Sequence, residues 1–143
     1  MRIFNRRANY EYKLTGEKVE AGISLLGAEA KAIRENRGDI SQAHGRILNG
    51  EVFLINANIP ATGVANYNPT RMRKLLLHKK EILALNTKLK QQKLNLVPIL
   101  VYTKGRLVKV SLALGKPKRK FEKKEAIKRK DIKRELEKEL GSK

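Results

Sequence analysis

Hydrophobic and polar positions alternate over several short stretches of this chain, a pattern typical of β-strands. The predicted strands are residues 10–14, 19–26, 43–48, 51–59, 96–102 and 107–114. Asn49-Gly50 and Lys104-Gly105 each separate two of these strands and predict β-hairpins. Residues 60–69 read as a polar loop. Strands joined by turns, with few helices between them, favour a small antiparallel barrel over a parallel sheet.

Two stretches have the helical period instead. Residues 28–36 and 77–91 each place apolar side chains on one face and charged side chains on the other. The inward positions are Ala28, Ala32 and Ile33 in the first helix, and Ile82, Leu85 and Leu89 in the second. The expected fold is therefore mainly β, an antiparallel barrel with short flanking helices.

The C-terminal residues 115–143 differ in composition from the rest. They hold 13 Lys and Arg against 6 Asp and Glu, and Phe121 is their one aromatic residue. Such a segment buries too little apolar surface to offset the entropy lost on ordering. Residues 126–140 are nevertheless rich in helix formers. We therefore expect a folded domain over residues 1–114 and a tail over 115–143, disordered alone and helical on a polyanion.

Charge indicates what this protein binds. The chain carries a formal charge of +19, and residues 1–114 alone hold 20 basic and 8 acidic residues. A surface this basic attracts phosphates and gains from counterion release, which favours nucleic acid. A charged surface that only keeps the protein soluble is the alternative. A membrane surface is disfavoured, because no stretch pairs a wide apolar face with aromatic anchors.

Residues that carry chemistry are sparse. The chain has no cysteine and two histidines, His44 and His78, so we expect no disulfide and no metal site. No phosphate-binding GxxxxGK loop or nucleophile motif is present. We therefore expect a binding protein without a cofactor, not an enzyme. The N-terminus lacks a signal peptide's apolar run and no long apolar segment occurs, so we expect a cytoplasmic protein.

Seven short stretches, taken in order, match a known family. They are residues 5–8 (NRRA), 20–23 (EAGI), 27–31 (GAEAK), 49–54 (NGEVFL), 73–79 (RKLLLHK), 96–98 (LVP) and 105–110 (GRLVKV). In this order the chain resembles the small protein B (SmpB) family, the SsrA-binding proteins of bacterial trans-translation, over essentially all of its length. The resemblance implies an OB-type barrel with a C-terminal tail.

The resemblance also implies a function. Proteins of this family bind the tRNA-like domain of transfer-messenger RNA, stand in for its missing anticodon half, and enter stalled ribosomes. The expected partners are therefore transfer-messenger RNA, the small-subunit rRNA of the decoding centre and message channel, and elongation factor Tu during delivery. The tail would enter the empty message channel as a helix. No covalent step would belong to this protein, and a monomer is expected.

The resemblance implies two sets of contact residues. For transfer-messenger RNA they are Asn5, Arg6, Arg7, Glu29, Lys31, Arg73 and Lys74. For the ribosome they are Phe121, Glu122, Lys123, Lys124, Lys128, Arg129, Lys133 and Arg134 in the tail. A carboxylate at Glu29 can accept hydrogen bonds from base amino groups or a ribose hydroxyl. Its alternative is a first-turn glutamate favoured by the helix dipole. The Phe121 ring can stack on a base, and its alternative is a lone exposed aromatic.

Two other classes share part of this pattern. A constitutive ribosomal protein would also have a basic domain and a basic tail, but it would occupy essentially every subunit. An RNA-modifying or RNA-cleaving enzyme would need a metal constellation or a nucleophile, and neither is evident in the sequence.

Overall fold

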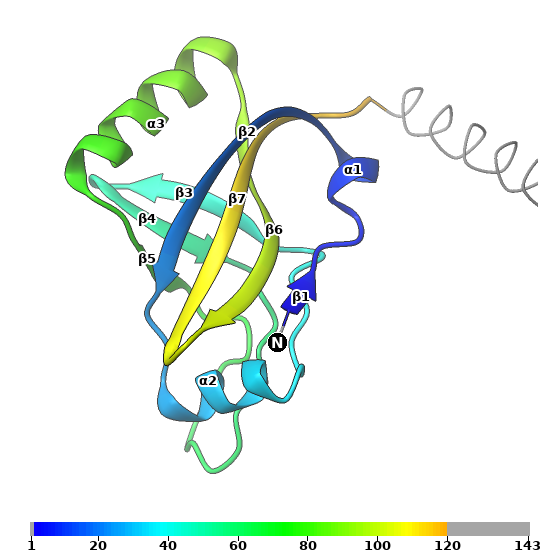
Figure 1. Cartoon of the computed structure of the whole chain (residues 1–143), viewed down its shortest axis with the longest axis vertical. Coiled ribbons are helices and arrows are strands. Elements are labelled where there is room, and N and C mark those ends of the chain that lie inside the picture. Colours follow the sequence, from blue (N-terminus) through cyan, green and yellow to red (C-terminus); the bar gives the residue numbers. More distant parts are fainter. Residues whose placement is uncertain (1, 120–143) are drawn as a thin grey trace, which may run out of the picture.

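The computed structural model describes residues 2–119, which form a closed antiparallel β-barrel with three helices around it (Figure 1). The strands are β1 (Arg2–Phe4), β2 (Tyr12–Ile23), β3 (His44–Leu48), β4 (Glu51–Ile55), β5 (Arg73–Leu76), β6 (Asn95–Lys104) and β7 (Leu107–Pro117). The helices are α1 (Ala8–Glu11), α2 (Gly27–Arg34) and α3 (Lys79–Gln92). The expected fold class, a mainly β antiparallel barrel with short helices, is confirmed.

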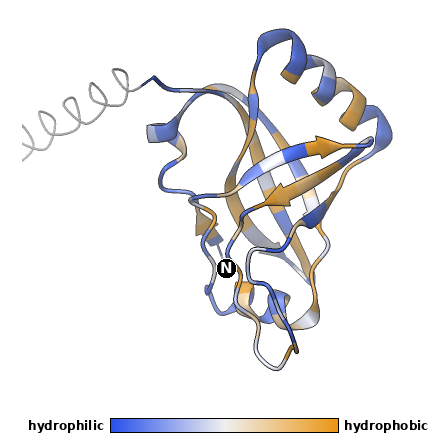
Figure 2. Cartoon of the chain, turned by 180° about the vertical axis from the view of Figure 1, so that it is seen from behind, coloured by the Kyte–Doolittle hydropathy of each residue, from blue (hydrophilic) through white to orange (hydrophobic). Residues whose placement is uncertain are grey.

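The barrel closes through the pairing of β6 with β7, which are 10 and 11 residues long. The strand order is β1-β6-β3-β4-β5-β2-β7, and β7 also pairs with β6, so six strands form a ring. β1 adds to β6 outside that ring, with Ile3 opposite Val101. Figure 2 colours much of the strands as hydrophobic, whereas hydrophilic and hydrophobic segments alternate along α3.

The core lies inside the ring of strands. Val52, Leu54, Leu96, Val110 and Leu112 are each at most 1% exposed. A Cβ atom added at Gly45 on β3 would lie 2.7 Å from a methyl carbon of Leu96 on β6. Glycine is therefore required where these two strands meet at close range. The barrel is small and filled, so any ligand must bind on its outside.

Both predicted hairpins are confirmed, as β3–β4 and β6–β7. The two predicted helices are also present, with ends shifted by one to two residues. Leu85 is buried, and Ile82 and Leu89 pack against the core as expected. His78 occupies the N-cap position of α3, and its backbone N–H is 3.4 Å from the Glu81 carboxylate.

The expectation of separate strands at 10–14 and 19–26 is wrong. Residues 8–11 form α1, and one strand, β2, then runs from Tyr12 to Ile23. Its pairing with β7 shifts register between Leu14 and Lys18, where Gly16 has φ +92°. A glycine at positive φ inside a strand allows a bulge instead of an end. The sequence analysis also missed β1 and β5, which are three and four residues long.

The C-terminal end of the barrel lies beyond the expected boundary at residue 114. β7 continues to Pro117, which pairs with Tyr12, and the Lys118 N–H donates to the Glu11 carbonyl at 2.9 Å. The predictions for the rest of the tail lie outside the described residues. They concern Phe121, Glu122, Lys123, Lys124, Lys128, Arg129, Lys133 and Arg134. Among residues 2–119, no helix is long and apolar enough to cross a membrane.

Candidate nucleic-acid interface

The residue that the sequence marked most clearly, Glu29, is the third residue of α2. Leu26 caps the helix in an extended conformation, and its backbone N–H donates to Glu29 Oε1 at 2.8 Å. This is one half of a capping box, and the negative carboxylate also interacts favourably with the positive end of the helix dipole. The local interpretation of Glu29 as a first-turn glutamate is therefore correct.

Glu29 has a second, non-local set of partners. Its side chain is fully buried and pairs with Arg71, through Nε at 3.0 Å and through Nη2, and with Arg73, through Nε at 2.9 Å. The Tyr67 hydroxyl lies 2.7 Å from Glu29 Oε2. One carboxylate thus joins α2 to the loop before β5 and to β5 itself. We call Glu29, Tyr67, Arg71 and Arg73 the Glu29 cluster.

Arg73 completes the cluster from the inside of the sheet. It is fully buried, and its Nη1 donates to the Ala57 carbonyl at 2.7 Å while its Nη2 donates to the Pro69 carbonyl at 2.8 Å. Its Nη2 also lies 2.9 Å from the Tyr67 hydroxyl, which in turn lies 2.5 Å from the Ile59 carbonyl. A buried guanidinium needs several acceptors, and here backbone carbonyls of residues 57–71 supply them. The cluster therefore fixes the 56–72 segment against the barrel.

The charges in the cluster are complementary. Burial alone would raise the pKa of Glu29, but hydrogen bonds from Arg71, the Leu26 N–H, Tyr67 and Arg73 outweigh it and lower the pKa to about 2. Burial and the hydrogen bond to Glu29 raise the pKa of the Tyr67 hydroxyl. Glu29 is therefore ionised and Tyr67 protonated throughout the physiological range.

Three of the expected RNA-contact residues are buried in this structure. Glu29 and Arg73 are 0% exposed, so neither presents an atom to RNA. Asn5 is 8% exposed, and its amide donates to the Pro98 carbonyl at 2.8 Å and accepts from the Arg7 N–H at 3.1 Å. The polar atoms of all three side chains form hydrogen bonds within the protein, and these bonds hold neighbouring segments of the fold together. In this conformation the Glu29 carboxylate is occupied by partners within the protein, and its expected hydrogen bonds to bases or ribose stay a prediction.

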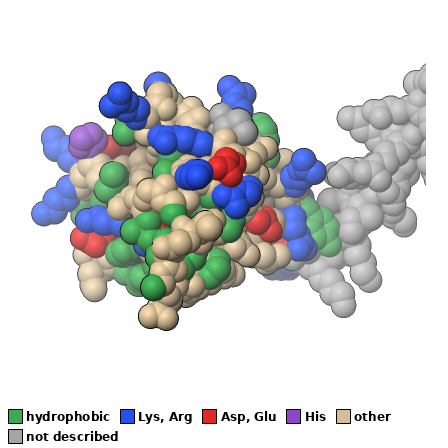
Figure 3. All heavy atoms as spheres, turned by 90° about the horizontal axis from the view of Figure 1, so that it is seen from below, with side chains coloured by type: hydrophobic (Ala, Val, Ile, Leu, Met, Phe, Trp, Pro, Cys, Tyr) green, Lys and Arg blue, Asp and Glu red, His purple; other side chains and the backbone are tan. Residues whose placement is uncertain are grey.

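The other four expected contacts are exposed. The side chains that reach solvent are those of Arg6, Arg7, Lys31 and Lys74. Two of them form ion pairs, Arg7 with Glu11 at 2.9 Å and Lys74 with Glu51 at 3.2 Å. Exposed ion pairs of this kind contribute little and open easily for a phosphate. Arg71 is also one-third exposed, although the Glu29 cluster holds it. Figure 3 shows Lys and Arg side chains over the upper part and both sides of the face seen from below, and hydrophobic side chains mainly over its lower part.

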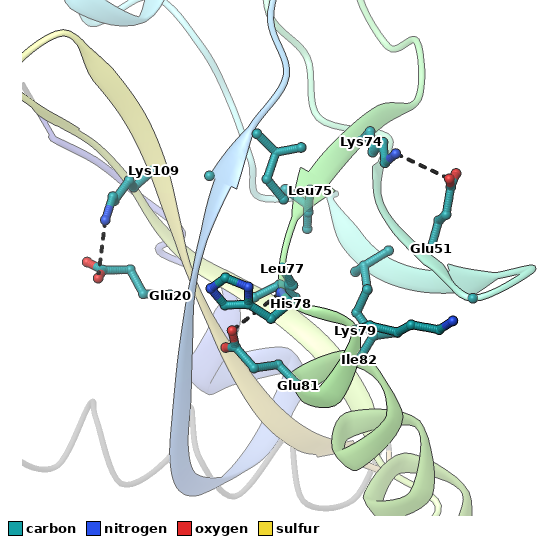
Figure 4. Close-up of a pocket in the computed structure, with 14 residues that line it drawn as sticks. Glu20, Glu51, Lys74, Leu75, Leu77, His78, Lys79, Glu81, Ile82 and Lys109 are labelled. Atoms are coloured by element: carbon teal, nitrogen blue, oxygen red, sulfur yellow. Dashed lines mark hydrogen bonds and ion pairs between the residues drawn. The ribbon is translucent and has the colours of Figure 1, made fainter.

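These cations do not line a common cavity. Arg6 and Arg7 line one beside β1, whereas Lys74 lines another, of about 540 Å³, between β5 and the start of α3. Figure 4 shows the second cavity, in which the Lys74–Glu51 and Lys109–Glu20 pairs lie on opposite sides of Leu75 and Leu77. Its acidic and basic residues largely balance, so it attracts a polyanion less than the exposed arginines do. Within residues 2–119 no three His, Asp or Glu side chains converge as metal ligands would.

The sequence analysis missed Tyr67 and Arg71. A signal for the inward direction of Arg73 existed, because it alternates with buried Leu75 on β5. No local signal indicated Tyr67, which lies in a loop 38 residues from its partner Glu29.

The fold and its surface define a small, strongly basic barrel protein of the OB type. The model of the SmpB protein family matches residues 2–142. The SsrA-binding protein of Sulfurihydrogenibium sp. is 46% identical over 142 residues, which cover 97% of this chain and 93% of the relative. The SsrA-binding protein of Dehalococcoides mccartyi strain BAV1 is 42% identical, over 95% of this chain and 80% of the relative.

A solved structure agrees with these relatives. It is described as "tmRNA-SmpB: a journey to the center of the bacterial ribosome", is 39% identical, and matches with a TM-score of 0.70 over 88% of this chain and 94% of its own. The chain belongs to the SmpB family.

Proposed function

We propose that this protein is an RNA-binding adaptor of trans-translation that binds the tRNA-like domain of transfer-messenger RNA. The observation that carries the proposal is the family match over residues 2–142, which includes both the barrel and the basic tail. The solved relative whose description names tmRNA, SmpB and the ribosome supports the same partners. The formal charge of +19 is consistent with a polyanionic ligand.

The barrel supplies the first contact in this proposal. Phosphates of the RNA are neutralised by exposed, long basic side chains that can reach them, those of Arg6, Arg7, Lys31 and Lys74. Arg71 joins them from the edge of the Glu29 cluster. Glu29 and Arg73 are positioning residues here: they hold the 56–72 segment and Arg71 in place without touching RNA.

The tail supplies the second contact. In this proposal it enters the empty message channel of a stalled ribosome and folds there as a helix. Phe121, Glu122, Lys123 and Lys124 then lie near the decoding centre, and the basic residues Lys128, Arg129, Lys133 and Arg134 contact small-subunit rRNA. Elongation factor Tu delivers the complex, the protein acts as a monomer in the cytoplasm, and the ribosome performs the only covalent chemistry.

Sequencing the RNA that copurifies with the protein from its native cells tests the proposal. We expect transfer-messenger RNA to be enriched far above its share of total RNA, and ribosomes to carry the protein substoichiometrically. Equal occupancy on every small subunit, without that enrichment, would indicate a constitutive ribosomal protein instead.

A further inference from the structure

The short edge strand β1 has an outer face that the contacts proposed above leave unused. Ile3 points into the core, while Arg2 and Phe4 point outward, and Phe4 is 58% exposed. Arg2 lies opposite Tyr102 of β6, and Phe4 lies opposite Leu100. Directly opposed residues in an antiparallel pair project from the same face of the sheet. An exposed phenylalanine therefore stands beside a half-buried leucine, with an arginine and a tyrosine in the next row.

The same rows continue onto β7, which lies beside β6 (Figure 1). Tyr102 pairs with Lys109, and Leu100 pairs with Ser111. We call the surface formed by Arg2, Phe4, Leu100, Tyr102, Lys109 and Ser111 the β1–β6–β7 face. Between its two rows, Ile3, Val101 and Val110 pack into the core and are at most 8% exposed. The face is thus a rigid platform, because the residues beneath it belong to the barrel.

Two cavities adjoin this platform, and Arg2 lines both. One, of about 390 Å³, includes Leu100, Tyr102 and Ser111 in its wall. The other, of about 450 Å³, is bordered by Phe4, Arg6 and Arg7. Its single acid is Asp39, whose carboxylate accepts the Ser41 N–H at 2.9 Å. Arg7 also pairs with Glu11 at 2.9 Å, so Arg2 and Arg6 against Asp39 leave this side of Phe4 with a net positive charge, which complements a phosphate chain.

Tyr102 contributes a polar group to the first cavity. Its hydroxyl is covered and has no hydrogen-bond partner among the described residues. A covered hydroxyl without a partner is unfavourable. The flexible side chains of Arg2 and Lys18 line the same cavity. This cavity wall therefore includes a tyrosine whose hydroxyl lacks a partner among the described residues, and a ribose or phosphate oxygen would supply one.

We propose that the β1–β6–β7 face binds an unpaired RNA segment, with one base stacked on Phe4 and the adjoining phosphates held by Arg2 and Arg6. This inference rests on the proposed function for the presence of an RNA, and it adds a single-stranded subsite to it. Aromatic rings beside cations are the chemistry that binds single strands, because every base has a face to stack and every link a phosphate. Arg2 and Arg6 favour this occupant over the apolar surface of a protein.

Phe4→Trp provides a direct readout, because the chain contains no tryptophan. We would titrate the full-length variant with octauridylate and follow its fluorescence. We expect the emission to be quenched at saturation as a base stacks on the indole. Leu83→Trp is the matched control, since Leu83 lies on α3 and is 60% exposed, about as much as Phe4. The tryptophan emission of this control should not change in the same titration.

Affinity provides the second readout. Phe4→Ala should weaken binding of both octauridylate and the tRNA-like domain at least about fivefold, the lower limit for losing one stacked base. Leu83→Ala should change neither. Arg2→Gln should reduce the salt dependence by about one counterion. Phe4 and Leu83 are exposed, so neither alanine variant should lower the melting temperature.

The outcomes separate this inference from the function on which it rests. If the protein binds the tRNA-like domain tightly but Phe4→Ala behaves as Leu83→Ala does with both RNAs, the subsite is refuted and the adaptor function stands. If the tRNA-like domain is not preferred over other RNAs but octauridylate still quenches Phe4→Trp, the adaptor function is refuted and the subsite stands. A loss confined to ribosome binding, with the affinities for octauridylate and the tRNA-like domain unchanged, would assign the face to a different contact on the ribosome and refute the proposed single-stranded subsite.

Discussion

Replacing Glu29 by alanine should destabilise the protein more than any exposed charge removal. The wild-type carboxylate is fully buried and accepts five hydrogen bonds, from the Leu26 N–H, Tyr67, Arg71 twice and Arg73. Its loss leaves the Arg73 guanidinium buried without a counter-charge. Removing one partner of a buried ion pair costs about 3–5 kcal/mol. Small domains have only about 5–15 kcal/mol of unfolding free energy in total.

The measurement is the melting temperature and the urea midpoint at pH 7. For a domain of this size, that loss corresponds to a melting temperature roughly 10–25 °C lower. Glu17→Ala is the matched control, because Glu17 pairs with Lys88 at 2.8 Å but both side chains are about half exposed. The control should lose less than about 1 kcal/mol. If Glu29→Ala were no less stable than Glu17→Ala, the Glu29 cluster would not hold the 56–72 segment, and the positioning role of Glu29 would fail.

Three further predictions concern charge and the tail. Because the pKa of Glu29 is lowered to about 2, its contribution to stability is present above the unfolded pKa near 4.5 and is lost between about pH 5 and pH 2. Between about pH 5 and pH 2 the unfolding free energy of the wild type should therefore fall by about 3 kcal/mol more than that of Glu29→Gln. Unfolding free energies that fall in parallel with pH in the two proteins would contradict this. Arg6→Ala and Arg7→Ala should each flatten the salt dependence of RNA binding by about one counterion, and an unchanged slope would remove that residue from the contact set. Glu135→Pro should break the predicted tail helix at a cost of about 3 kcal/mol and impair tagging but not RNA binding, whereas undiminished tagging would mean that the tail acts without a helix.

Local patterns predicted much of the barrel. Asn49-Gly50 forms a hairpin because both residues adopt positive φ, at 50° and 76°, and this dipeptide tolerates that conformation well. The period of α3 placed Leu85 in the core correctly. β1 was missed because three residues are too few to show a period. The predicted gap between residues 14 and 19 was wrong because a glycine such as Gly16 gives the same local signal in a bulge as in a turn.

The site was less predictable than the fold. The family motif marked Glu29 as important but not as buried, because its partners Tyr67 and Arg71 lie 38 and 42 residues away in the sequence. Only the closed barrel brings α2 beside the 56–72 segment. The alternation of Arg73 with the buried Leu75 was a signal that its side chain points inward. This signal was not used, because a charged residue is expected to be exposed unless a buried partner is known. The sequence therefore singled out Glu29 and Arg73 but did not indicate that they are buried and paired with each other.

The central claim is that the barrel binds transfer-messenger RNA and that the tail is needed only on the ribosome. The most direct test truncates the chain after Arg119, which keeps all of β7 and the Lys118–Glu11 hydrogen bond. Affinity for the tRNA-like domain and tagging on stalled ribosomes would be measured with the truncated and the full-length protein. The account predicts that the truncated protein keeps most of its RNA affinity and loses tagging. Equal loss of both activities, or retention of both, would contradict it.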